Sequence, residues 1–124
     1  MNIRPLRQAA VPLVAPLLLG ACEFGGCTLS AEFAVHVTVR DSASDSLLVD
    51  GVRGSIREGF FIDSLRLQSS LPDVFAAGYE RGGRYTVQVE MPGYMPWTAQ
   101  DVVAEESACF VHTAELVARL QQQS

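Results

Sequence analysis

Two histidines and three cysteines are among the side chains in this sequence whose types could carry reactive or metal-binding chemistry. The histidines, His36 and His112, could form a metal pair or supply a general base. His36 lies on the polar side of an alternating apolar segment, and His112 stands among apolar residues near the C-terminus. Histidines so placed are more often solvated or hydrogen-bonded, and no Gly-x-Ser-x-Gly motif occurs. We therefore expect no catalytic residue, no metal site, no cofactor and no enzymatic activity.

Acidic residues gather in two further places. Asp41, Asp45 and Asp50 crowd one predicted turn, but their spacing matches no known calcium-binding loop. Glu105 and Glu106 could be paired carboxylates for glycoside chemistry, although adjacent residues of an extended chain point apart. We expect both groups to belong to solvated turns and loops.

Three aromatic residues, Tyr79, Tyr94 and Trp97, could line a surface that binds sugar or peptide. Aromatic residues in this kind of sequence are more typical of core and turn packing. A large exposed aromatic patch would favour binding, because monomers seldom expose such patches without a partner. Buried Tyr94 and Trp97 side chains would favour a structural role.

The first 21 residues have the organisation of a secretory signal peptide. Arg4 and Arg7 give a positive start, and an apolar run follows from Ala9 to Leu19. A membrane-spanning helix needs about 20 apolar residues, so this run is too short to span. Residues 1–21 are therefore predicted to be cleaved.

The stretch Leu19-Gly20-Ala21-Cys22 resembles the lipobox of bacterial lipoproteins. This resemblance implies that Cys22 is acylated and becomes the first residue of a mature protein held to the membrane of the cell envelope. The alternative is an ordinary signal peptide cut near Ala21. Aspartate after the lipidated cysteine is the usual signal for inner-membrane retention, so Glu23 favours the outer membrane. Residues 22–32 form the lipidated N-terminus and a short tether.

If Cys22 carries lipid, the remaining cysteines are Cys27 and Cys109. An exported protein occupies an oxidising compartment in which disulfides persist. Metal binding is the alternative, but two cysteines without a CxxC motif or a nearby histidine make a poor site. A Cys27–Cys109 disulfide is therefore predicted.

Composition bounds the partners of the mature chain. After removal of the signal, 7 arginines face 14 acidic residues, and lysine is absent from the sequence. Nucleic-acid binding requires a basic stripe, so we expect no nucleic-acid partner. The remaining 103 residues are enough for one domain.

Alternating apolar residues predict β-strands through most of the chain. In Phe33–Arg40, Phe33, Val35, Val37 and Val39 share one face, and Tyr85–Met91 alternates as cleanly. Several short strands separated by turns predict an all-β sandwich over residues 33–120, followed by a frayed tail, 121–124. Further strands are expected at Val52–Arg57, Phe60–Gln68, Trp97–Val103 and within Cys109–Leu120.

The stretch from Gly83 to Tyr94 resembles the carboxypeptidase regulatory-like domain, with its Gly-x-Tyr motif, alternating strand and Gly-Tyr turn. In that family the strand after this turn carries an aromatic residue, which corresponds here to Trp97. The resemblance implies a seven-stranded transthyretin-like (prealbumin/Ig-like) sandwich, in which the first and last strands are neighbours. Residues 69–82 depart from the family pattern, and the strand order there is left open.

The sequence thus predicts a non-catalytic, lipid-anchored β-sandwich of the cell envelope with a structural or protein-interaction role. Its partners would be the membrane, through the lipid anchor, and an envelope protein or glycan. The alternative is a lipoprotein that binds carbohydrate or peptide through exposed aromatics near Tyr94 and Trp97.

Overall fold

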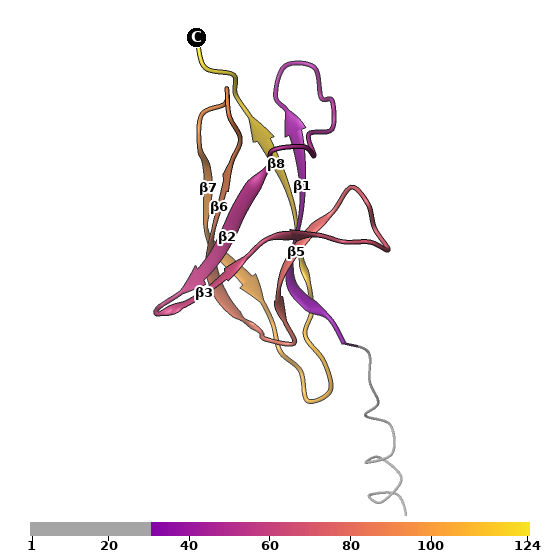
Figure 1. Ribbon diagram of the computed structural model, residues 1–124. Helices are drawn as coiled ribbons and strands as arrows, with labels where there is room; N and C mark the ends of the chain where they lie inside the picture. Colours follow the sequence, from indigo (N-terminus) through magenta and orange to yellow (C-terminus); the bar gives the residue numbers. More distant parts are fainter. Residues whose placement is uncertain (1–30) are drawn as a thin grey trace, which may run out of the picture.

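The computed structural model describes residues 31–124, which form two four-stranded β-sheets packed as an open sandwich (Figure 1). The predicted signal peptide, Cys22 and Cys27 lie outside the described residues. Within residues 31–124, no helix is long and apolar enough to cross a membrane. The first sheet has the order β4 (Arg66–Leu67), β5 (Phe75–Tyr79), β1 (Phe33–Asp41), β8 (Ala114–Leu120). The second has the order β3 (Phe61–Ser64), β2 (Arg53–Glu58), β6 (Gly83–Glu90), β7 (Trp97–Ala104).

Strand β1 has a neighbour on both edges. It pairs antiparallel with β5, where Val35 lies opposite Ala77. It pairs parallel with β8, where Val37 lies opposite Leu116. The resemblance implied that the first and last strands are neighbours, and the structure confirms this adjacency.

The parallel β1–β8 pair defines the two ends of the sandwich. At the end that we call proximal, β1 begins at Phe33 and β5 ends opposite it at Tyr79. At the other end, which we call distal, Asp41 lies opposite Leu120 and the C-terminus leaves the domain (Figure 1). The chain therefore enters and leaves the sandwich at opposite ends.

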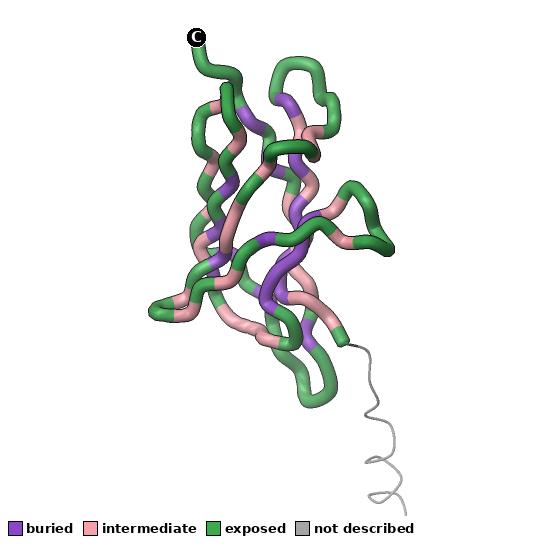
Figure 2. Tube along the Cα trace, viewed as in Figure 1, coloured by how far each residue is buried: buried purple, intermediate pink, exposed green. Residues whose placement is uncertain are grey.

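The core lies between the sheets, and buried positions alternate with more exposed ones along the strands that form it (Figure 2). Val35, Val37 and Val39 of β1 are buried, as the sequence pattern predicts. Tyr85, Val87 and Val89 of β6 are buried against them from the second sheet. Alternation with one buried face fixes the register, since a slip by one residue would expose the whole apolar set.

The segment Phe60–Gln68, predicted as one strand, is divided at Leu65. The side chain of Leu65 is buried, and its backbone nitrogen donates to the oxygen of Gly54. At this point the chain passes from β3 in the second sheet to β4 in the first. The domain consequently has two four-stranded sheets instead of the seven strands that the resemblance implied.

Two further expectations change. In the predicted run Cys109–Leu120 only β8 is a continuous strand, because residues 105–113 form a loop closed by a bridge between Glu106 and Val111. The tail is not frayed: Gln122 bridges to Tyr94, and Gln121 accepts from the nitrogen of Met95. Strand β5 fills the stretch whose order was left open and lies between β4 and β1.

Gly78 and Gly59 offer a matched test of this packing, since both have left-handed φ values, +77° and +60°. A Cβ at Gly78 would lie 2.8 Å from that of Ala34 and 3.0 Å from Ile56, whereas at Gly59 it would meet nothing within 4 Å. We expect Gly59→Ala to cost about 1 kcal/mol of unfolding free energy, from the left-handed backbone alone. Gly78→Ala should cost about 2 kcal/mol more, because it also overpacks the core.

Urea unfolding followed by the fluorescence of Trp97, the only tryptophan, measures both costs. Equal losses in the two variants would contradict the close approach of β5 to β1 and β2.

Candidate functional site

The distal end is organised around the carboxylate of Asp41, which is 4% exposed. One carboxylate oxygen accepts hydrogen bonds from the backbone nitrogens of Ala43 and Ser44, at 2.8 and 2.9 Å. The other accepts from the Tyr94 hydroxyl at 2.7 Å and the Gln122 side-chain amide at 2.9 Å. The expectation that Asp41 belongs to a solvated turn is therefore wrong: four donors from three segments surround it.

These donors fix the ionisation of the cluster. The Ser44 nitrogen, followed by Tyr94 and Gln122, holds the pKa of Asp41 well below its usual range. The hydrogen bond from the Tyr94 hydroxyl to Asp41 also raises the pKa of Tyr94, because it stabilises the protonated phenol. Both groups thus keep fixed protonation states near neutral pH. The cluster joins the loop after β1 and the C-terminal residues to the turn before β7.

The other acidic residues that the sequence analysis named are solvent-exposed. Asp45 and Asp50 are exposed in the loop that follows β1. Asp45 pairs with Arg119 and, at 3.9 Å, with Arg40. Glu105 and Glu106 are exposed in the loop before β8, as expected.

Two shallow grooves flank Pro96 at the distal end. Tyr94 borders one of about 290 Å³, and Trp97 borders one of about 170 Å³. Both aromatic side chains are half-buried and pack against the core. Each side chain is therefore only partly exposed where it borders its groove.

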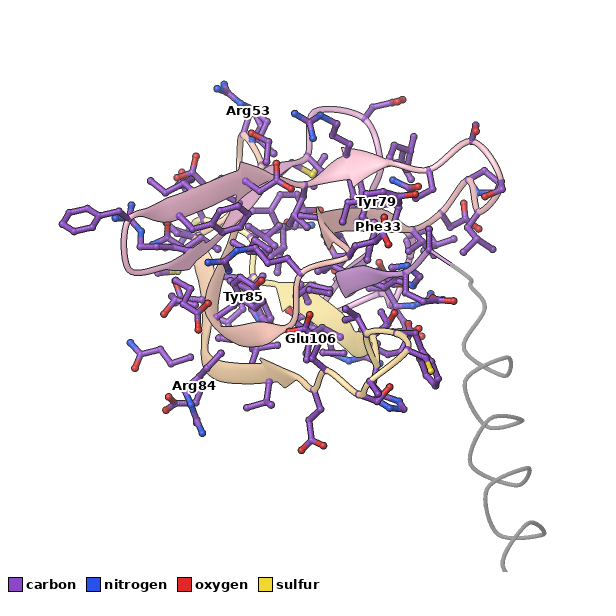
Figure 3. All side chains as sticks on the ribbon, turned by 90° about the horizontal axis from the view of Figure 1, so that it is seen from below. Phe33, Arg53, Tyr79, Arg84, Tyr85 and Glu106 are labelled. Atoms are coloured by element: carbon purple, nitrogen blue, oxygen red, sulfur yellow. The ribbon has the colours of Figure 1, made fainter. Side chains whose placement is uncertain are left out.

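Tyr79 lies elsewhere. It is 55% exposed at the proximal end, and its ring stands edge-on to that of Phe33, with centroids 5.2 Å apart (Figure 3). The length of β1, about 30 Å for nine residues, separates it from the distal end. Tyr79, Tyr94 and Trp97 therefore do not form one surface.

A second polar cluster, which the sequence analysis missed, lies at the proximal end around Arg81. Its guanidinium donates to Glu58 and to the Tyr85 hydroxyl, both at 2.9 Å, and stacks 3.8 Å from the ring centroid of Phe61. The Tyr85 hydroxyl donates back to the Arg81 carbonyl oxygen. The sequence did hold one indication of this cluster. Tyr85 lies on the apolar face of a regularly alternating strand, and a buried tyrosine hydroxyl needs a hydrogen-bond partner.

Electrostatics in this cluster also favour a structural role. The Arg84 nitrogen, which donates to Glu58 at 2.9 Å, lowers the pKa of that carboxyl together with Arg81. Burial raises the pKa of Tyr85. Glu58 is therefore ionised and Tyr85 neutral, so neither is poised to exchange a proton near pH 7.

The two histidines have separate partners. His36, on the outer face of β1, lies 3.2 Å from a carboxylate oxygen of Glu115. His112 is exposed in the loop before β8, and its ring packs on Phe110 with centroids 4.7 Å apart. Among residues 31–124 no three His, Cys, Asp or Glu side chains are grouped so that they could hold a metal ion.

A third surface is an open polar groove of about 320 Å³ on the second sheet. Arg53 lies beside Glu90 at one side of it, and Gly54 forms part of its floor, where a Cβ would lie 2.5 Å from the Gln88 oxygen. The polar side chains along it are Arg53, Ser55, Ser64, Gln88 and Glu90. They can offer hydrogen bonds to a ligand, and no histidine lies beside the serines among these lining residues.

Cys109 is exposed in the loop before β8 and does not lie in a strand. It lines a small proximal pocket of about 130 Å³ together with Glu32, the residue just before β1. Its predicted partner, Cys27, lies outside the described residues, so the disulfide stays a prediction.

The described part of the chain is thus an all-β sandwich whose buried polar groups join loops to sheets. Comparison of the chain with known proteins gives no match to a family model and no match to a curated sequence. The function is therefore argued below from the chain's own residues.

The Asp41 cluster predicts a pH dependence of stability. A carboxyl whose pKa is depressed in the folded state stabilises the fold above its unfolded pKa of about 3.9, and this contribution is lost as the pH falls toward the folded value. Asp41→Asn should lower stability at pH 7 and weaken the loss of stability below pH 4. Thermal melts from pH 2 to pH 7 measure this, with Asp50→Asn, an exposed loop residue, as the control. Parallel stability–pH curves for wild type and Asp41→Asn would contradict the role of the carboxylate.

Proposed function

We propose that the protein is a non-catalytic β-sandwich, anchored in the bacterial cell envelope by lipid on Cys22, with a structural or protein-interaction role. The observation that carries the non-catalytic part is the use of its buried polar groups. Buried Asp41 accepts hydrogen bonds from three separate segments, and half-buried Glu58 accepts from the Arg81 side chain and from the backbone nitrogen of Arg84 in β6, so both carboxyls are held ionised. Such groups stabilise the ends of the sandwich; ionised carboxylates with lowered pKa values have no proton to donate near pH 7 and are weak proton acceptors.

The anchor is supported by the sequence before the domain. The run from Ala9 to Leu19 and the small residues before Cys22 fit a lipoprotein signal. Strand β1 begins at Phe33, eleven residues after Cys22, a span of at most about 40 Å. The disulfide proposed below would shorten the free tether to the five residues from Cys22 to Cys27, at most about 18 Å. The proposed membrane is the outer one, because Glu23 stands where aspartate would favour inner-membrane retention.

A relation to the carboxypeptidase regulatory-like domain is also proposed. The two-sheet sandwich and the Gly83–Tyr94 stretch support it: Gly83 begins β6, and Gly93, with a φ of +88°, lies in the turn that Tyr94 closes onto Met91. Eight strands in place of seven and the crossing at Leu65 are where this chain differs.

The second candidate is binding of carbohydrate or peptide at the distal end. The specific observation in its favour is that Tyr94 and Trp97 border grooves on either side of Pro96. A saturable change in Trp97 fluorescence on adding oligosaccharides or peptides would support this candidate. Tyr79 takes no part in it, because it lies at the opposite end.

The first prediction from the proposed function concerns the lipid anchor on Cys22. Cys22→Ser should move the protein from the membrane fraction to the soluble fraction, and the diacylglycerol mass on the N-terminal peptide should be lost. Cys27→Ser is the matched control and should remain in the membrane. Membrane retention of Cys22→Ser, or an unmodified wild-type peptide that begins at Cys22, would contradict the anchor.

The second prediction concerns the Cys27–Cys109 disulfide. Cys27 precedes Glu32 by five residues, a span of at most about 18 Å, and Glu32 shares a pocket with Cys109. A bond that closes a loop of about 80 residues should contribute about 4 kcal/mol. We therefore expect Cys27→Ser, Cys109→Ser and the double variant to lose the same amount of stability, since each removes the same bond.

Thermal melting with and without a reductant separates this bond from local effects of the substitutions. The reductant should lower the melting temperature of the wild type and leave the variants unchanged. Additive losses in the double variant, or a wild type indifferent to reductant, would refute the bond.

A further inference from the structure

Strand β8 is an edge strand without the bulge, the proline or the short length that often protects an edge. It pairs with β1 along one side, and no strand within residues 31–124 pairs along the other. It runs for seven residues without glycine, proline or a left-handed residue. Such an edge offers a row of backbone donors and acceptors to another strand.

The other three edges are poorer templates. Strand β7 contains Asp101 with a φ of +57°, and its pairing with β6 shifts register between Tyr85 and Val87. Irregularities of this kind discourage a further strand. Strand β3 has four residues and β4 has two. The free edge of β8 is therefore the longest regular one in the described domain.

The outward side chains of β8 are complementary to themselves. Glu115, Val117 and Arg119 share its outer face, where Val117 is 50% exposed and the two charged side chains are 73% and 53% exposed. If two copies of β8 pair antiparallel about Val117, Glu115 of each lies opposite Arg119 of the other. Opposite charges at directly facing positions stabilise a strand pair, and like charges destabilise it.

From this arrangement we infer that β8 is a self-association edge and that its partner is a second copy of this chain. The two Val117 residues then face each other on the twofold axis. On the inner face, half-buried Leu116 lies opposite Ala118 of the other copy and is covered further. The two first sheets become one continuous eight-stranded sheet, formed by an isologous interface.

This inference names the partner for the proposed interaction role, and it is compatible with the proposed anchor. Antiparallel pairing places the two proximal ends at opposite ends of the joined strands, about 30 Å apart. With Cys27 held to Cys109 by the proposed disulfide, the five residues from Cys22 to Cys27 can still span about 18 Å, so both lipids can reach one membrane when the strands lie along it. Confinement to a membrane raises the effective concentration of the two copies.

A single cysteine at the twofold position tests the pairing in the full-length protein in its membrane. Facing Cβ atoms of an antiparallel pair lie about 5 Å apart, close to the distance that a disulfide requires. Val117→Cys should give a covalent dimer on non-reducing gels under mild oxidation. Ile62→Cys is the matched control, because Ile62 is a β-branched residue with 55% exposure on the edge strand β3. Neither Ile62→Cys nor the wild type should give a covalent dimer on these gels.

A charge exchange separates pairing from local structural effects, because Glu115 and Arg119 also contact His36 and Asp45 within the chain. In the Val117→Cys background, Glu115→Arg or Arg119→Glu alone should reduce the dimer at least fivefold. The two changes together should restore it, since each charged residue again faces its opposite, even though both contacts within the chain are altered.

Three results would overturn the inference: no dimer with Val117→Cys, as when another segment of the same chain covers β8; equal dimer with Ile62→Cys; or a double exchange weaker than either single one. Membrane retention of every variant, measured in the same samples, reports on the anchor separately. If no dimer forms but the protein stays in the membrane fraction, the pairing is overturned and the proposed anchor is not.

Discussion

The parallel pairing of β1 with β8 is the constraint on which the rest of the domain depends. It runs in one register from Val35–Ala114 to Asp41–Leu120. Parallel neighbours cannot be joined by a hairpin, so the chain between them must cross over. Here that connection contains the whole second sheet as well as β4 and β5. The same pairing brings the loop before β8 to the start of β1 and the C-terminal residues to its end.

Each end of the sandwich is then closed by a buried or half-buried charge. At the distal end Asp41 accepts hydrogen bonds from Tyr94 and Gln122, which are 53 and 81 residues away in the sequence. At the proximal end Arg81 donates hydrogen bonds to Glu58 and Tyr85. In both clusters the donors and acceptors are matched, which offsets the cost of removing the charge from water. These clusters leave the sheet faces and the edge of β8 as the surfaces open to partners.

The sequence predicted the strands whose pattern depends on one buried face. Strands β1 and β6 follow from alternation alone, because Val35, Val37, Val87 and Val89 all lie in the core. The crossing at Leu65 could not be predicted in this way, since the two residues of β4 are too few to show a period. The hydrogen-bond partners of Asp41 could not be predicted from the sequence either, because they come from distant segments that only the assembled sheets bring together.

The candidate site was predicted less well than the fold, for a related reason. Aromatic residue type indicated Tyr79, Tyr94 and Trp97 as a possible surface, but residue type carries no information about which end of a strand a residue occupies. Tyr79 faces Phe33 at one end, and Tyr94 faces Asp41 at the other. The proposed role of the protein therefore rests on its anchor and its edges more than on a pocket.

Cross-strand nuclear Overhauser effects between β1 and β8 test the central claim most directly. In a parallel pair the contacts advance together along both strands, so Val35 should contact Ala114, Val37 should contact Leu116, and Val39 should contact Ala118. Contacts that run in opposite directions along the two strands, or contacts of β1 with another strand in place of β8, would contradict the account.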